Sequence, residues 1–359
     1  MPGASSGQLS RSLSLIDNTT AGNRSSLSVV VVGRNEGARL TRCLNSVHAM
    51  AMPTRRIEVI YVDSASTDDS IRRAKAAGVS VLELRKDRLS AARARNAGWR
   101  IAKSDIILFV DADTELLPEF ARDAINYFEN DPSTAVVFGH RRERDPHASI
   151  YTRVLDLDWI APTGLVDFCG GNALVRRSVL EELGGFDENL FAGEEPELCC
   201  RMRSRGWKIR YLDLMMATHD FGITRLNQYW RRAVRTGYAY AEVSRRFSNT
   251  DFPLWSKEAR RNRINLALML GLIASATGMA MHFRSLLPLL CALCVAAALT
   301  ARTIFRNRWK TRNLFTLILY AVHSHLQQLP IFCGQMRYWW RRRRHLASSP
   351  IEYKDSIFS

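Results

Sequence analysis

The stretch that decides the fold is ILFVDADTELLPEF, residues 107–120, in which an apolar run ends in Asp111 and Asp113 with one alanine between them. A continuous apolar run is typical of a strand that is buried on both faces. Two carboxylates close together repel each other, and burying either of them without a partner costs free energy. The pattern therefore predicts a buried strand whose end meets a positive charge.

Similar runs lie on both sides of this strand. They are LSVVVVG (27–33), RIEVIYVD (56–63), VSVLEL (79–84) and TAVVFGH (134–140), separated by the helical stretches DDSIRRAKAAG (68–78), SAARARNAGWRIAKS (90–104) and PEFARDAINYFEND (118–131). The alternation predicts an α/β fold, Rossmann-like, with right-handed crossovers and a mostly parallel sheet flanked by helices. The segment HRRERDPHAS (140–149) is predicted to be a loop.

Polar residues follow three of the predicted strands, in the groups Arg34-Asn35-Glu36, Asp63-Ser64 and Asp111-Ala112-Asp113. In doubly wound sheets, ligands bind outside the carboxyl ends of the strands. Any one of these groups could be only a turn or a helix cap. Three of them at one edge of the sheet indicate a binding site.

The segment from residue 170 to residue 220 contains glycines and acidic residues that could contribute to the site. Gly170 and Gly171 permit a close approach of backbone to a ligand. Glu194 and Glu195 open a predicted helix, where acidic residues also favour the helix dipole without any further role. The run KIRYLDLMMATHD (208–220) predicts a strand that leads to His219.

Seven ordered motifs resemble those of the family 2 glycosyltransferases, which are nucleotide-sugar-dependent enzymes with a GT-A fold. They are VVVVGRNEG (29–37), VDSASTDDS (62–70), ARARNAG (92–98), FVDADTELLP (109–118), CGGNALVRRSVLEELGGFDE (169–188), GEEPELCCRMRSRGW (193–207) and His219. A single Asp-x-Asp motif is weak, whereas seven motifs in this order are specific. The resemblance covers residues 27–245.

The resemblance implies roles for individual residues. Contacts to the nucleotide sugar are implied for Arg34, Glu36, Asp63, Ser64, Ser66, Arg95, Asn96, Asp111, Gly171 and Asn172. Asp111 and Asp113 would hold Mn²⁺ or Mg²⁺ together with His219, whose imidazole favours Mn²⁺. Glu195 would be the general base for an acceptor hydroxyl, with inversion at the anomeric carbon. The family more often has aspartate at that position, so Glu194 is the alternative base.

The net charge of +16, from 51 basic and 35 acidic residues, favours an anionic partner. Much of the basic charge lies beside apolar segments in the last third, and no nucleic-acid-binding signature is present, which favours a membrane over nucleic acid. The seven cysteines are scattered, and we expect them to be reduced. Cys291 and Cys294 form a CxxC inside an apolar run, where a zinc or redox role is not expected.

Two apolar segments, residues 264–283 and 286–301, are long enough or nearly long enough to span a bilayer as helices. The cluster RRNR (260–263) precedes the first, and basic residues from Arg302 to Arg312 follow the second. A hairpin of two spans puts both clusters on the cytoplasmic side of the inner membrane. Residues 314–333 are predicted to form an interfacial helix or a third span. A buried helical hairpin of a soluble domain is the alternative.

These patterns predict a disordered tail over residues 1–26, a GT-A glycosyltransferase domain over 27–250 and a membrane-associated helical region over 251–359. The basic and aromatic segment 227–247 would form a helix that lies on the membrane, covers the mouth of the active site or presents a solvated basic face. The expected function is transfer of a sugar from a UDP- or GDP-type donor to a lipid-linked or polysaccharide acceptor at the membrane. The alternative is a catalytically silent relative that acts as a scaffold in polysaccharide assembly.

Overall fold

The computed structural model describes residues 27–50, 52, 56–85, 89–190 and 192–346. The predicted disordered tail, residues 1–26, lies outside them. Among the described residues a nine-stranded sheet forms the centre of the first two-thirds of the chain. Its strands are β1 (Leu27–Gly33), β2 (Ile57–Asp63), β3 (Ser80–Glu83), β4 (Ile106–Asp111), β5 (Thr114–Leu116), β6 (Thr134–Glu143), β7 (Gly164–Leu165), β8 (Ala173–Arg176) and β9 (Lys208–His219).

The strand order is β3-β2-β1-β4-β8-β6-β9-β5, and β7 pairs with β9. The first four strands are parallel, and their register places Gly33 beside Asp63 and Val32 beside Asp111. The residues that follow these strands therefore emerge at one edge of the sheet. The α/β class is as predicted, and β8, β5 and β7 add antiparallel pairs that make the sheet mixed.

The predicted loop over residues 140–149 is wrong in its first part, because β6 continues to Glu143. Strand β9 provides a partner along this extension, pairing Arg141 with Ala217 and Glu143 with His219. The many charged residues of the segment suggested a loop, but backbone pairing with a strand that is distant in sequence outweighs local composition.

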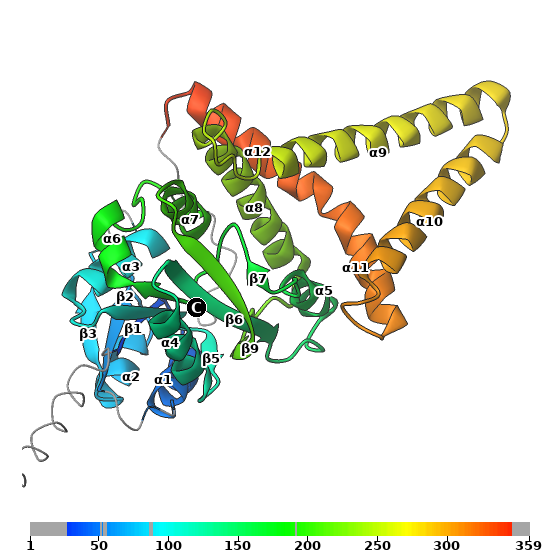
Figure 1. The fold of residues 1–359 in the computed structure, drawn as a ribbon. Coiled ribbons are helices and arrows are strands. Elements are labelled where there is room, and N and C mark those ends of the chain that lie inside the picture. The colour runs from blue at the N-terminus through cyan, green and yellow to red at the C-terminus, as the bar shows by residue number, and fades with distance from the viewer. Residues whose placement is uncertain (1–26, 51, 53–55, 86–88, 191, 347–359) are drawn as a thin grey trace, which may run out of the picture.

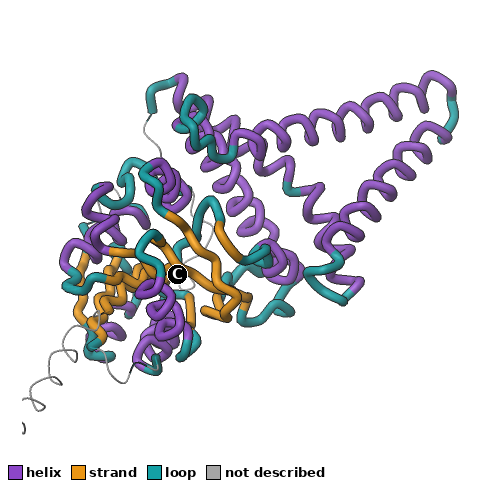
Figure 2. Tube along the Cα trace, in the orientation of Figure 1, coloured by secondary structure: helices purple, strands orange, loops and turns teal. Residues whose placement is uncertain are grey.

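Alternating side chains of β1 build two hydrophobic layers. Val29 and Val31 pack with α1, α2 and α4, whereas Val30 and Val32 pack with α3, α6 and α7. Helices therefore cover both faces of the sheet (Figure 2). These helices, with α5, are α1 (Ala38–His48), α2 (Ser70–Ala76), α3 (Ala91–Ile101), α4 (Phe120–Asn130), α5 (Ile150–Asp158), α6 (Arg177–Leu183) and α7 (Glu194–Ser204).

Five helices follow the sheet in the described chain: α8 (Leu226–Arg246), α9 (Ser256–Phe283), α10 (Leu287–Asn307), α11 (Leu314–Leu326) and α12 (Gln328–Arg343). Helices α8 and α12 pack with their backbones in contact. A Cβ atom on Gly237 would lie 1.8 Å from the Ile331 carbonyl oxygen, and one on Gly334 would lie 2.0 Å from the Val234 carbonyl oxygen. Only glycine permits this approach.

Helices α9 and α10 form a hairpin that extends away from the sheet (Figure 1). Both are long and apolar enough to cross a membrane, and their side chains are largely exposed, Leu268 to 67% and Met281 to 75%. The segment 314–333 is divided at Gln327 between α11 and α12, so it does not form one continuous helix. The packing of α12 on α8 explains why this segment departs from the pattern of a simple span.

An amide network fixes the base of this hairpin. Asn262 of α9 donates to the Gln328 carbonyl oxygen at 3.0 Å and to its side-chain oxygen at 2.7 Å. Gln335 of α12 donates to Asn262 Oδ1 at 2.9 Å. Asn262 and Gln335 are buried, so these bonds satisfy amide groups that would otherwise be costly to bury.

Candidate active site

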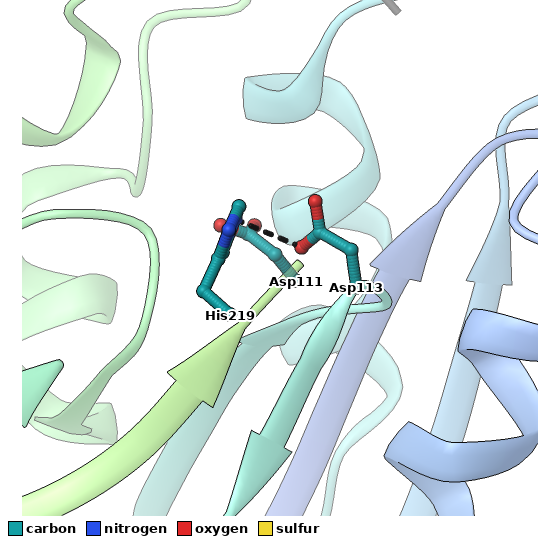
Figure 3. Close-up of side chains that lie close together, drawn as sticks. All are labelled: Asp111, Asp113 and His219. Carbon is teal, nitrogen blue, oxygen red and sulfur yellow. Dashed lines mark ion pairs between the residues drawn. The ribbon is translucent and has the colours of Figure 1, made fainter. Parts of the chain in front are cut away.

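A cluster of two carboxylates and an imidazole lies at the edge of the sheet. Asp111 ends β4, Asp113 precedes β5, and His219 ends β9 beside Thr114. His219 Nε2 lies 3.1 Å from Asp113 Oδ1, and one ligand atom from each of the three residues lies within 4.8 Å of the others (Figure 3). Carboxylate and imidazole donors in this arrangement fit Mn²⁺ or Mg²⁺.

Asn172 and Gly171 hold the strand end that carries this cluster. The Asp111 N–H donates to Asn172 Oδ1 at 2.7 Å, and Asn172 Nδ2 donates to Thr114 Oγ1 at 3.2 Å. A Cβ atom on Gly171 would lie 2.4 Å from Arg95 Nη2 and 2.6 Å from Asp111 Oδ2. Glycine at this position therefore leaves room for the pair formed by Arg95 and Asp111.

Arg95 provides the positive charge that the Asp-x-Asp stretch predicted. Its guanidinium donates to Asp111 Oδ1 at 2.9 Å and to Glu194 Oε1 at 3.0 Å, and lies 3.0 Å from Glu195 Oε1. Burial disfavours the cation, but the charges of Glu195, Asp111 and Glu194 raise the pKa of Arg95 above its ordinary value. Arg95 thus remains charged and joins α3, β4 and α7.

Glu195 differs from its neighbour Glu194 in exposure. The Glu195 side chain is 16% exposed and the Glu194 side chain 4%. Burial raises the pKa of Glu195 to about 7, and the charge of Glu194 adds to this rise while Arg95 opposes it. A carboxylate with a pKa near neutrality is suited to accept a proton from a hydroxyl.

A cavity of about 1790 Å³ connects the sheet edge with the C-terminal helices. Nine of the predicted site residues line it: Arg34, Glu36, Ser64, Arg95, Asp111, Asp113, Glu194, Glu195 and His219. The other five, Asp63, Ser66, Asn96, Gly171 and Asn172, lie outside this lining. The cavity is therefore formed by the strand ends on one side and by α8, α9 and α11 on the other.

Asp63 and Ser66 hold the turns that follow β1 and β2, behind the residues that line the cavity. Asp63 accepts hydrogen bonds from Tyr61 Oη at 2.8 Å and from Ser66 N and Oγ at 2.7 and 2.6 Å. Ser66 Oγ in turn accepts the Asn35 N–H at 2.9 Å. This chain of bonds fixes the turn that presents Arg34 and Glu36 to the cavity.

Asn96 is occupied by contacts with the loop that follows α6. Its Nδ2 donates to the Phe186 carbonyl oxygen at 2.8 Å and to Glu188 Oε1 at 2.9 Å. Its Oδ1 accepts from Phe186 N and Trp99 Nε1, both at 2.9 Å. In this structure Asn96 therefore positions the loop beside the cavity, and the contact with the nucleotide that the resemblance implied stays a prediction.

The sequence reasoning missed a polar group on the helical side of the cavity. His323 Nδ1 lies 2.6 Å from Tyr229 Oη, His323 Nε2 lies 3.5 Å from Asp158 Oδ2, and Tyr320 donates to Asp158 Oδ1 at 3.1 Å. Asp158, Tyr229 and His323 come from α5, α8 and α11. The only signal in the sequence was a histidine within an apolar segment, which does not identify its partners.

Comparison with known protein families and curated proteins gives the following matches. The family model described as Glycosyl transferase family 2 matches residues 28–184. The pre-mycofactocin glycosyltransferase of Mycobacterium tuberculosis is 27% identical over 244 residues, which are 64% of this chain and 49% of that protein. The O-antigen chain rhamnosyltransferase WbaN of Salmonella anatum is 27% identical over 209 residues, 54% of this chain and 66% of that protein. The chain thus spans about half to two-thirds of the length of these relatives.

Solved structures are also similar over most of the chain. The mannosyltransferase PcManGT from Pyrobaculum calidifontis, in complex with GDP-Man and Mn²⁺, has a TM-score of 0.59 at 20% identity. The similarity covers 90% of this chain and 89% of that one. At this level of identity the similarity concerns the fold, which is of the GT-A type.

Proposed function

We propose that this chain, whose residues 28–184 match the Glycosyl transferase family 2 model, is a glycosyltransferase of that family, and that it moves a sugar from a UDP- or GDP-type donor to a hydroxyl of a lipid-linked or polysaccharide acceptor. The observation that carries the proposal is the adjacency of the Asp111, Asp113 and His219 cluster to Glu195, with Arg95 bonded to both sides. A site for a divalent cation and a candidate base thus face one cavity.

The donor belongs at the sheet edge. Asp111, Asp113 and His219 would hold Mn²⁺ or Mg²⁺, which when bound supplies positive charge to the diphosphate leaving group. Arg34, Glu36 and Ser64 line the adjoining part of the cavity, where the nucleoside would bind. The fold relative in complex with GDP-Man and Mn²⁺ supports this choice of donor and metal.

The acceptor hydroxyl is activated by Glu195. The acceptor oxygen forms a bond to the anomeric carbon as the bond between that carbon and the diphosphate oxygen breaks. The proton passes to the Glu195 carboxylate, and the nucleoside diphosphate leaves. Direct displacement of this kind inverts the anomeric configuration, and Arg95 keeps Glu195 in a fixed position relative to Asp111.

A scaffold without activity is the second candidate, because Glu195 stands where the family more often has aspartate. The position of Glu195 favours the enzyme. Its carboxylate lines the cavity, and its pKa of about 7 allows it to accept a proton near neutral pH. Glutamate thus retains the properties that a general base requires.

We also infer that the chain is attached to the inner membrane with its catalytic domain on the cytoplasmic side. The exposed apolar hairpin of α9 and α10 supports attachment. The basic residues within the ranges 260–263 and 302–312 lie at the base of this hairpin, which is the arrangement expected for a cytoplasmic face.

Thermal stabilisation of the purified full-length chain tests the proposed function. UDP-, GDP-, dTDP- and CMP-sugars are added with Mn²⁺ to the wild type, to the double variant Asp111→Ala/Asp113→Ala and to Asp251→Ala, which changes an exposed aspartate outside the cavity. One nucleotide class should raise the melting temperature of the wild type and Asp251→Ala but not of the double variant. Equal stabilisation of the double variant would remove these carboxylates from donor binding, and no stabilisation by any donor would favour the scaffold.

A further inference from the structure

An aromatic wall adjoins the metal-ligand cluster on the side that faces the helices. Trp159 and Phe221 stack with ring centroids 4.4 Å apart. The His219 ring meets both edge-on, at 5.1 Å from Trp159 and 4.9 Å from Phe221. These two rings therefore lie between His219 and the two arginines described next, Arg141 and Arg232.

An arginine guanidinium stacks over each of the two rings, Trp159 and Phe221. The Arg141 Cζ atom lies 4.1 Å from the Trp159 centroid, and the Arg232 Cζ atom lies 4.9 Å from the Phe221 centroid. In the described part of the chain neither guanidinium has a carboxylate within ion-pair distance or donates a hydrogen bond, and Arg141 Nε is buried without a partner. Both cations thus stack on aromatic rings with no ion pair among the described residues, although the charges of Asp111 and Asp113 act on Arg141 and that of Asp158 interacts with Arg232 at longer range.

The environment of Arg141 is unfavourable to its charge. Burial lowers the pKa of Arg141, and the nearby positive charge of Arg232 also lowers it, although Asp111 and Asp113 oppose this change. The two like charges repel each other. A bound anion would offset both the burial and the repulsion.

Arg232 is the member of this pair that reaches the cavity. It lines the cavity on α8, and Arg261 lines it at the base of α9. Burial raises the pKa of Tyr240 to about 12, and the charges of Asp158 and Glu258 add to this rise. The charges of Arg261 and Arg232 both oppose it, so both arginines act on the same hydroxyl. Arg141 lies behind Gly170, where a Cβ atom would be 3.5 Å from Arg141 Nη2.

We propose that Arg232, supported by the positive charges of Arg141 and Arg261, binds a phosphate group of the acceptor. The inference rests on the proposed function and specifies its substrate class, an acceptor that carries a phosphate near the accepting hydroxyl. A guanidinium suits phosphate oxygens because its N–H groups form paired, charge-assisted hydrogen bonds. The position fits an acceptor rather than the donor, since Phe221 and His219 separate Arg232 from the carboxylates where the donor diphosphate belongs.

Its place beside the hairpin base also fits a lipid-linked acceptor. Arg261 begins the part of α9 that leads into the exposed apolar hairpin, and the cavity extends to His323 and Gln327 of the neighbouring helices. A phosphate attached to a lipid chain would reach Arg232 from this side, with the accepting sugar or hydroxyl extended towards Glu195.

The test measures binding of a short lipid phosphate to the full-length chain in detergent. The probe is geranylgeranyl phosphate, with geranylgeraniol as the uncharged control, in the presence of Mn²⁺ and saturating UDP or GDP. The variants are Arg232→Gln, Arg232→Lys and, as a matched control, Arg231→Gln, which changes an exposed arginine on the same helix outside the cavity lining. We expect Arg232→Gln to weaken phosphate binding about tenfold or more, Arg232→Lys to restore part of it and Arg231→Gln to change it less than about twofold.

Five outcomes would contradict the inference. Equal binding of the probe by Arg232→Gln and the wild type would show that Arg232 holds no acceptor phosphate. Equal binding of the phosphate and the alcohol would show that only the lipid chain is recognised. Weaker UDP or GDP binding in Arg232→Gln would assign this arginine to the donor diphosphate. A wild type that binds nucleotide with Mn²⁺ but not the probe would overturn the inference and leave the proposed function standing, whereas failure to bind any nucleotide would overturn both.

Discussion

The two walls of the cavity differ in how they balance charge. On the sheet-edge wall, Arg95 is bonded to Asp111, Glu194 and Glu195, and His219 lies against Asp113. On the helical wall, Arg246 is paired with Glu242 and His323 lies 3.5 Å from Asp158. Arg232 of this wall, and Arg141 of β6 behind it, instead rest on aromatic rings with no carboxylate within ion-pair distance in the described chain.

This difference separates two ways of building a site. A wall whose charges are paired within the protein keeps its geometry before any ligand arrives, which suits groups that act on a reacting bond. An arginine that lines the cavity without an ion-pair partner in the described chain, as Arg232 does, can pair with a ligand, which suits recognition of an anion. In the proposed function, the sheet edge would therefore carry out the chemistry and the helices would select the acceptor.

The largest effect should come from breaking the sheet-edge wall at its metal ligands. Asp113→Asn removes one negative charge from the cluster and should lower sugar transfer by about 10³-fold, because less positive charge would then be held at the leaving group. The measurement is the transfer rate as a function of Mn²⁺ concentration, with Asp251→Asn as the exposed control. Full activity of Asp113→Asn would exclude the cluster from the reaction.

The next largest effect should come from the proposed base. Glu195→Gln should lower kcat by about 10²-fold while donor affinity is retained, because proton removal is lost but the nucleotide pocket is not. Glu194→Gln, with its side chain less exposed to the cavity, should lower kcat less. If Glu194→Gln gives the greater loss, the assignment of the base must be exchanged between the two.

The pH dependence sharpens the same assignment. With a pKa of about 7, Glu195 is protonated below neutrality, so wild-type kcat should rise with pH and level off above pH 7. This folded pKa is raised above the ordinary value of 4.5, so ionisation of Glu195 destabilises the fold as the pH rises through 7. Glu195→Gln should therefore be at least as stable as the wild type at pH 8, and a lower melting temperature there would attribute its loss of activity to unfolding.

A smaller effect, on thermal stability, should follow from disturbing the contact between α8 and α12 that supports the helical wall. Gly334→Ala places a Cβ atom 2.0 Å from the Val234 carbonyl oxygen and should destabilise the α8–α12 packing by about 3 kcal/mol. Gly271→Ala is the matched control, because no atom lies within 4 Å of its new Cβ. Thermal unfolding of both variants measures the difference. Equal melting temperatures would show that the two helices can separate without cost.

The smallest effect is expected in the exposed hairpin. Cys291 and Cys294 are free and exposed on α10, away from both walls of the cavity. The double variant Cys291→Ser/Cys294→Ser should change sugar transfer by less than about twofold, with no dependence on a zinc chelator. A larger loss, or sensitivity of the wild type to the chelator, would give the CxxC motif a role that its surroundings do not suggest.

Much of the sheet-edge wall could be predicted because its signals are local. Each apolar run ends in its own polar group, and parallel pairing brings these ends to one edge. The charge expected beside Asp111 is found in Arg95, but its bonds to Glu194 and Glu195 depend on α7 lying against α3 across the edge. Likewise, five residues implied as ligand contacts stand behind the lining, since sequence does not tell a residue that faces a cavity from one that supports the loop behind it.

The sequence by itself determined the α/β alternation, the carboxylates at the strand end and the two apolar segments, because hydrophobic periodicity and residue chemistry are properties of short stretches. Only the tertiary structure decided that β6 extends through Arg141, that α12 packs on α8 through Gly334 and that Arg232 stands one ring away from His219. These features depend on partners far apart along the chain. Their energies come from packing and charge in three dimensions, which no local pattern records.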